Sequence, residues 1–135
     1  MRELGVEVSK KIHAKNKGAL GERQVRDILN NYKLPSGEPV KAKRGCQHSG
    51  GTDSPDVEHN ISNLHLEIKR TESMNPAKAR LALLQAKKDA GENLPVVVWR
   101  SNRTDWVAML TFADLLNLLG CTVCDQQLQE HSNNE

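Results

Sequence analysis

The sequence contains few aromatic residues and cysteines, and it has no long apolar run. Its 135 residues include only two Trp, one Tyr and one Phe. A surface that stacks the bases of single-stranded nucleic acid needs several such rings, so the composition argues against one. Three cysteines are too few for a disulfide framework. Because the chain lacks both a run of about 18 apolar residues and the apolar segment of a signal peptide, we expect a soluble, cytoplasmic protein.

Acidic residues are scarce in the first third of the chain. Residues 10–44 contain ten Lys or Arg and three acids, although the formal net charge of the whole chain is only +2. A basic region of this kind favours a polyanionic partner, and a merely solvated basic surface is the alternative. With so few aromatic residues, contacts to the backbone of duplex DNA suit this composition best.

A length of 135 residues predicts a single domain, and the polar ends of the chain predict flexible termini. We expect a flexible basic arm over residues 1–16, one domain over residues 17–124 and a disordered polar tail over residues 125–135. The expected order of elements is helix, strand, hairpin, helix, strand, strand, helix. Helices are predicted over 18–31, 76–90 and 112–119, and strands over 40–44, 54–59, 64–70, 94–99 and 106–110. The predicted fold class is α/β, with a mixed central sheet flanked by helices.

Local signals mark where the last two helices begin. Asn75 and Pro76 form an N-cap and N1 pair, and Gly91 closes the helix that follows. Thr111 with Asp114 resembles a capping box. A strand on each side of the 76–90 helix predicts a parallel crossover connection.

Two acids are predicted to face each other across the hairpin. If residues 60–63 form its loop, Val57 pairs with Leu66, and Asp56 pairs with Glu67. Directly opposed residues share one face of a sheet, so the two carboxylates would repel each other. A divalent cation between them removes this repulsion.

Two further charged residues are expected near this pair. Lys69 lies two residues after Glu67 and therefore on the same face of the strand, opposite the core-facing Leu66. Glu22 falls on the apolar stripe of the first predicted helix, where an acid is rare unless it is paired. A salt bridge from Glu22 to Arg26 at the margin of the stripe is the alternative.

These residues fit the hydrolysis of a phosphodiester with magnesium. We expect Asp56, Glu67 and the backbone carbonyl of Ile68 to bind Mg²⁺, for which Mn²⁺ is expected to substitute. Glu22 would bind a second ion or act through water. Lys69 can hold the attacking water or a phosphate oxygen as a compact point charge.

The sequence Pro55-Asp56 followed by Glu67-Ile68-Lys69, with Glu22 on a preceding helix, resembles the PD-(D/E)xK nuclease superfamily. Within it the chain is similar to the small archaeal and phage-type Holliday junction resolvases over roughly residues 17–116. The segments that carry this similarity are Lys17-Gly18-Ala19-Leu20-Gly21-Glu22-Arg23, Lys43-Arg44-Gly45, Ser49-Gly50-Gly51, Gln85 and Leu94 to Trp99. The resemblance implies a restriction-endonuclease-like core and a homodimer that nicks four-way DNA junctions with magnesium, in DNA recombination and repair.

The catalytic set expected from the residues and the resemblance together contains one amide besides the charged groups. It consists of Glu22, Asp56, Glu67, Lys69 and Gln85, of which Gln85 comes from the resemblance alone. Basic side chains near this set are candidates for phosphate contacts. They are Lys17, Arg23, Lys43, Arg44 and Arg70.

Other functions stay open on the sequence alone. Repair and restriction-type endonucleases share the same core, and a related protein could bind DNA without cutting it or could cut RNA. A zinc-stabilised nucleic-acid-binding module is a further alternative. Its ligands would be Cys46, His48, Cys121 and Cys124. The other histidines, His13, His59, His65 and His131, are expected on solvated or partly covered surfaces.

Overall fold

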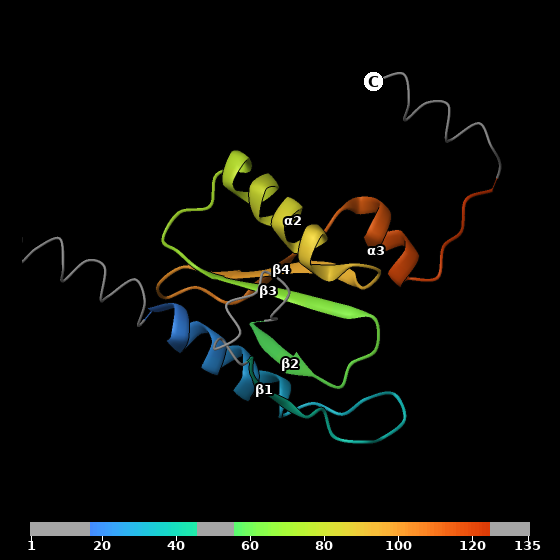
Figure 1. Ribbon diagram of the computed structural model, residues 1–135, viewed down its shortest axis with the longest axis horizontal. Helices are drawn as coiled ribbons and strands as arrows, with labels where there is room; N and C mark the ends of the chain where they lie inside the picture. The colour runs from blue at the N-terminus through green and yellow to red at the C-terminus, as the bar shows by residue number, and fades with distance from the viewer. Residues whose placement is uncertain (1–16, 46–55, 125–135) are drawn as a thin grey trace, which may run out of the picture.

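The computed structural model describes residues 17–45 and 56–124 of the chain. A first helix covers residues 17–29, and Figure 1 shows it in blue on one side of the strands. The helices α2 (Pro76–Ala90) and α3 (Phe112–Leu118) lie on the other side. The predicted arm and tail fall outside the described residues. No helix in the described part of the chain combines the length and the apolar character that crossing a bilayer requires.

Three strands form the mixed sheet at the centre of the fold. They are β3 (Leu64–Arg70), β4 (Leu94–Arg100) and β5 (Val107–Met109), in the order β3-β4-β5. β3 pairs with β4 in parallel, and β4 pairs with β5 antiparallel. Because α2 connects β3 to β4, the predicted parallel crossover is confirmed. The predicted α/β class, with a mixed sheet between helices, is confirmed as well.

The first two strands form a separate antiparallel pair, which corrects the predicted hairpin. β1 (Ala42–Arg44) pairs with β2 (Val57–His59), whereas the sequence pattern predicts β2 as the partner of β3. Val57 therefore lies opposite Arg44 rather than opposite Leu66. The predicted ladder pairs, including Asp56 with Glu67, are wrong as strand pairs.

Asparagine side chains explain why β2 pairs with β1. Asn30, just after the first helix, binds both backbone groups of Ala42: its Oδ1 accepts from the Ala42 N–H at 2.7 Å, and its Nδ2 donates to the Ala42 carbonyl at 3.1 Å. Asn60 Oδ1 accepts from the N–H of Lys41 at 2.8 Å. Asn60 thus links the end of β2 to the start of β1, while Asn30 holds β1 against the end of the first helix. A short connecting loop alone does not reveal these contacts.

Two apolar clusters cover the two faces of the sheet. Val25 of the first helix packs with Leu66 and Val96 on one face. Ala86 of α2 packs with Val97 on the other face. Successive residues of a strand point to opposite faces, so the adjacent Val96 and Val97 contribute to different clusters. The prediction that Leu66 faces the core is therefore confirmed.

The local helix signals are also confirmed. The side chain of Asn75 accepts from the N–H of Lys78 at 2.8 Å, and α2 ends before Gly91, whose φ of 61° suits glycine. Thr111 caps α3 through its side chain, which accepts from Asp114 N at 3.2 Å.

The apolar stripe of the first helix is shorter than the sequence pattern predicts. Val25 is buried, but Ile28 is 40% exposed and Tyr32 is 63% exposed. The helix ends at residue 29 instead of the predicted residue 31, so Tyr32 lies beyond its last turn. One face of this helix packs on the sheet mainly through Val25 and Leu29.

Candidate active site

Asp56 lies at the free edge of β3. Because β4 pairs with only one side of β3, the other side has backbone groups with no strand partner in the described residues. The N–H of Ile68 donates to Asp56 Oδ2 at 2.9 Å across this edge. The N–H and C=O of one residue in an extended strand point to the same side, so the Ile68 carbonyl faces Asp56 too. A side-chain hydrogen bond thus replaces the predicted ladder and still places Asp56 beside the Glu67-Ile68-Lys69 motif.

Glu67 presents one oxygen to each of two neighbours on its strand. Its Oε1 lies 3.2 Å from Lys69 Nζ, and its Oε2 lies 3.8 Å from His65 Nε2. Only 12% of the Glu67 side chain is exposed. Burial alone would raise the pKa of Glu67, but the contacts with His65 and Lys69 outweigh it and lower the pKa. Glu67 is therefore a buried, ionised carboxylate.

Glu22 points inward from the first helix, as its place in the apolar stripe predicts. It is 8% exposed, and its Oε2 accepts a hydrogen bond from Arg44 Nε at 2.8 Å. Arg26, the alternative partner from the sequence, pairs with Asp27 instead. Glu22 is close enough to Asp56 to act on its carboxylate electrostatically.

Asp56 carries the largest pKa shift in the site. Its pKa rises to about 6, mainly because burial disfavours the charged form. The Glu67 and Glu22 carboxylates raise it further, while the Ile68 N–H and Lys69 act in the opposite direction. We call these residues, Glu22, Asp56, Glu67, Ile68 and Lys69, the edge site. Its partly buried carboxylates leave negative charge that a cation would neutralise.

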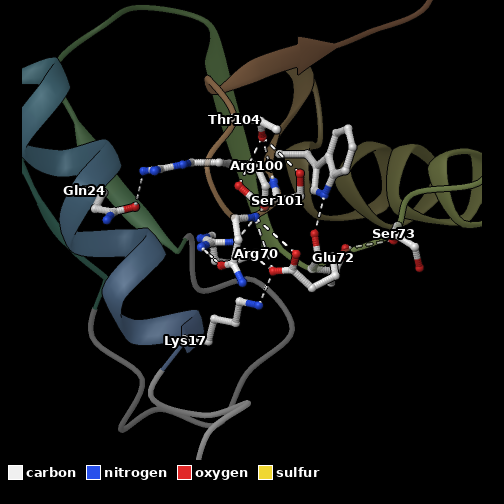
Figure 2. A network of polar contacts seen from close by, with 11 residues as sticks. Lys17, Gln24, Arg70, Glu72, Ser73, Arg100, Ser101 and Thr104 are labelled. Atoms are coloured by element: carbon white, nitrogen blue, oxygen red, sulfur yellow. Dashed lines mark hydrogen bonds and ion pairs between the residues drawn. The ribbon is translucent and has the colours of Figure 1, made fainter.

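A network of polar contacts fixes the first helix against the sheet (Figure 2). Lys17 forms an ion pair and hydrogen bond with Glu72, just after β3. Further along the helix, Gln24 Oε1 accepts from Arg100 Nη1 at 3.2 Å. Between these contacts the helix approaches β3 closely, because a Cβ atom at Gly21 would lie 3.2 Å from the Cβ of Arg70.

Arg70 is the centre of this network. Its Nη1 donates to the carbonyl of Arg100 at 3.0 Å, and its Nη2 donates to Asn102 Oδ1 at 2.6 Å. The N–H of Asn102 lies 3.2 Å from Glu72 Oε1. We call these residues, Lys17, Gln24, Arg70, Glu72, Arg100 and Asn102, the anchor network. It fixes the helix on which Glu22 lies.

The five basic residues predicted to contact DNA differ in the ion pairs that they already make within the protein. Lys17 and Arg70 belong to the anchor network, and Arg44 donates to Glu22. Lys43 pairs with Glu58 at 3.2 Å, but its side chain is 77% exposed. Arg23 is exposed and makes no ion pair with any residue that the structure describes. Arg23 and Lys43 are therefore the most accessible of the five.

Gln85, predicted from the resemblance to be catalytic, is exposed on α2. Its Nε2 donates to Asp89 Oδ2 at 2.9 Å. No hydrogen bond joins its side chain to Asp56 or Glu67 within residues 17–45 and 56–124. Gln85 instead contacts Asp89, which lies one turn further along α2.

The structure adds two residues that the sequence interpretation missed. Ligand atoms of His65, Glu67 and Asp89 all lie within 4.8 Å of one another, in a group that could hold a metal ion. His65 is 8% exposed, so the expectation of a solvated or partly covered histidine is wrong. Its position two residues before Glu67 was a usable signal, because both residues share one face of β3. Asp89 gave no comparable signal, since only the packing of α2 brings it there.

Only two of the four predicted zinc ligands lie within the described residues. Cys121 and Cys124 are free and exposed after α3, whereas Cys46 and His48 lie outside the described residues. The four-ligand zinc module stays a prediction.

Comparisons with known proteins find a likeness in fold. No protein-family model matches the chain, and no curated protein matches it. A search of solved structures finds Hjc of Archaeoglobus fulgidus, described as a Holliday junction resolvase from an archaeal hyperthermophile. The identity is 15%, the TM-score is 0.42, and the match covers 66% of this chain and 72% of that chain. The activity of the chain is therefore inferred from the edge site itself.

Proposed function

We propose that the protein is a metal-dependent DNA endonuclease whose preferred substrate is the four-way Holliday junction. The observation that carries this proposal is the edge site: Asp56, held on the Ile68 N–H, lies beside Glu67 with Lys69 next to it. Glu22 adds a third carboxylate from the first helix. Burial, and to a smaller extent the neighbouring Glu67 and Glu22 carboxylates, raise the pKa of Asp56, so a cation that binds its charged form would be favoured.

The residues of the edge site fit a magnesium ion. Asp56, Glu67 and the Ile68 carbonyl would bind it, because Mg²⁺ prefers oxygen ligands and needs only one or two carboxylates. Glu22 is placed to bind a second ion or to act through water. Bound Mg²⁺ would neutralise charge on the scissile phosphate and lower the pKa of a bound water. Mn²⁺ has the same preference for carboxylate oxygens and would substitute for it.

Lys69 has the position and charge to orient a reactant. Its Nζ is 3.2 Å from Glu67 Oε1, and its side chain is 36% exposed, so the ammonium group can reach both the site and the solvent. A lysine there can hold the attacking water or a phosphate oxygen in line with the scissile bond. Arg44 holds the Glu22 carboxylate in place through the 2.8 Å hydrogen bond.

DNA would reach the edge site along a surface with accessible basic residues. Arg23 and Lys43 are exposed, so they can contact phosphates at little cost to the fold. Exposed pairs such as Lys43 with Glu58 are weak and exchange readily for a phosphate. Lys17, Arg44 and Arg70 are candidates for contacts that require their internal pairs to rearrange.

The activity also implies two copies of the chain, because a junction is resolved by paired nicks in two strands. Exposed apolar residues on α2 and α3 support a homodimer. They include Leu81, Leu84, Phe112 and Leu118, all more than 60% exposed. Sedimentation of the purified protein with and without junction DNA measures the number of copies.

A cleavage assay with four DNA substrates tests the function. The protein, with Mg²⁺ or with a chelator, is given a synthetic four-way junction, a linear duplex, a flap and single strands. We expect paired symmetric nicks on the junction only, and none with Asp56→Asn. Cutting of the linear duplex would favour the repair or restriction-type alternative. A folded protein that cuts none of the substrates, or full activity in the variant, contradicts the proposed site.

A further inference from the structure

A partly buried group of potential metal ligands lies on the side of Glu67 that faces away from Lys69. Glu67 Oε2 is 3.8 Å from the Nε2 of His65, whereas Oε1 faces Lys69. Asp89, in the last turn of α2, brings its carboxylate within 4.8 Å of both ligand atoms. We call His65, Glu67 and Asp89 the inner cluster. It shares only Glu67 with the edge site.

Two atoms of the inner cluster are buried without a hydrogen-bond partner among the described residues. His65 is 8% exposed, and its Nε2 makes no hydrogen bond, because 3.8 Å to Glu67 is too long for one. Asp89 Oδ1 is also buried and has no hydrogen-bond partner. Buried polar atoms are normally satisfied, so two such atoms directed at one point indicate a missing ligand.

The position of Asp89 in α2 strengthens this interpretation. Asp89 is the residue before the last of the helix, where the partial negative charge of the helix end disfavours a carboxylate. Gln85 Nε2 donates to its Oδ2 at 2.9 Å, and its buried Oδ1 has no hydrogen-bond partner among the described residues. A cation bound there would offset the unfavourable charge. Gln85 would then be a positioning residue for Asp89.

An access route leads to the cluster from solvent. His65 and Asp89 line a cavity of about 340 Å³, whose walls include residues of β2 and the loop before β3. A metal site needs such a route and room for water.

We propose that the inner cluster is a second metal site, which binds a transition-metal ion such as Zn²⁺ or Co²⁺. One imidazole nitrogen and two carboxylate oxygens suit these ions better than they suit Mg²⁺. Three protein ligands leave a position for water from the cavity. Ligand atoms around tetrahedral Zn²⁺ lie roughly 3.3 Å apart, from bonds of about 2.0–2.1 Å, so small rotations of Glu67 and Asp89 close the site.

This site is distinct in chemistry from the magnesium site of the proposed function. Its nitrogen ligand selects for softer ions, and its other carboxylate comes from α2 rather than from β2 or the first helix. Its existence does not rest on the nuclease activity, because metal binding can be measured without DNA.

Cobalt titration of the full-length protein tests the proposal. Co²⁺ absorbs in the visible range with bands that depend on its ligands, and cysteine ligation adds an intense charge-transfer band. The proteins compared are wild type, His65→Gln, Asp89→Asn, Asp56→Asn and, as an exposed control, Asp105→Asn. Thermal unfolding with and without Zn²⁺ provides a second measurement, since an ion that binds only the folded state raises Tm.

We expect wild type, Asp56→Asn and Asp105→Asn to bind one Co²⁺ at the inner cluster with similar affinity and without a thiolate band. Asp89→Asn and His65→Gln should bind it at least tenfold more weakly and lose the rise in Tm with Zn²⁺. If His65→Gln fails to fold, Asp89→Asn decides the outcome. Loss of binding in Asp56→Asn with normal binding in Asp89→Asn would overturn the proposal, as would a thiolate spectrum or no binding by wild type. Loss of DNA cleavage in every assay would leave this result unchanged.

Discussion

The anchor network and the edge site contain the same kinds of charged side chain, but cations outnumber acids in the anchor network and acids outnumber cations in the edge site. In the anchor network one acid, Glu72, contacts two cations, Lys17 and Arg70. In the edge site the neighbours of Asp56 include two further acids, Glu67 and Glu22. Surplus cations around Glu72 lower its pKa, first through the hydrogen bond from Lys17, whereas burial raises the pKa of Asp56 to about 6. One region is arranged to hold the fold together, and the other keeps charge available for a ligand.

A single step along β3 separates the two regions. Lys69 and Arg70 are neighbours in sequence, but successive residues of a strand point to opposite faces. Lys69 therefore reaches Glu67, whereas Arg70 lies against the first helix at Gly21. This contrast makes matched substitutions informative, because similar changes on either side of the strand should affect different properties.

The largest effect is expected for Glu67→Gln, compared with Glu72→Gln. Replacing Glu67 removes a carboxylate that would bind Mg²⁺, so junction cleavage should fall by roughly 10²–10³-fold or more, while junction binding persists. Replacing the exposed Glu72 should leave cleavage within a factor of a few, because exposed ion pairs contribute little. Single-turnover cleavage at saturating protein measures both. Equal losses of cleavage in the two variants would mean that Glu67 matters no more for the reaction than an exposed acid outside the edge site.

A second pair, Arg70→Ala and Lys69→Ala, should separate stability from activity. Arg70 is 7% exposed in its side chain and donates to Arg100 and Asn102, so its loss should lower the free energy of unfolding by about 2–3 kcal/mol. Lys69 is partly exposed, and its loss should change the free energy of unfolding by less than about 1 kcal/mol while it slows cleavage strongly. Urea unfolding followed by a cleavage assay checks both. Lower stability in Lys69→Ala than in Arg70→Ala would reverse the assigned roles.

The third prediction concerns the pH dependence of Asp56. Its pKa is raised from 3.8 to about 6 in the folded protein, so the folded state binds the proton more tightly than the unfolded state. The associated stability is present at low pH and is lost as the pH rises through about 6. Without metal, Asp56→Asn should therefore be more stable than wild type by roughly 1–2 kcal/mol near pH 8, and no more stable near pH 4.

Magnesium should reverse this difference. Mg²⁺ requires the ionised carboxylate, so it should stabilise wild type but not Asp56→Asn near pH 8, and cleavage by wild type should fall below about pH 6. Urea unfolding at the two pH values, with Mg²⁺ or a chelator, measures these effects. If Mg²⁺ changed the stability of wild type and Asp56→Asn equally at every pH, Asp56 would not be a magnesium ligand.

The sequence predicted the elements better than their pairing. The bounds of α2 coincide with the prediction because Asn75, Pro76 and Gly91 are local signals that act within a few residues. The pairing of β2 with β1 is accompanied by a long-range contact between Asn60 and Lys41, and Asn30 fixes β1 against the first helix; no periodicity encodes these contacts.

The candidate site follows the same rule. Alternation along β3 correctly placed Glu67 and Lys69 together, and an acid in an apolar stripe correctly marked Glu22. Asp56 comes near Glu67, as expected, but through the Ile68 N–H rather than through a strand pair. Asp89 depends on how α2 packs across the sheet, so sequence patterns could not include it.

The smallest effect is expected for two glycines of the first helix, which test how closely the anchor network holds it. At Gly18 a new Cβ would meet nothing within 4 Å, so Gly18→Ala should add a few tenths to about 1 kcal/mol of stability through helix propensity. At Gly21 the Cβ would lie 3.2 Å from Arg70 and 3.4 Å from Trp106, so the contact should cancel that gain. Urea unfolding of both variants measures the difference. Cleavage should fall only in Gly21→Ala, since a displaced helix also displaces Glu22; equal stabilisation with full activity in both would show that the helix is not held closely against β3.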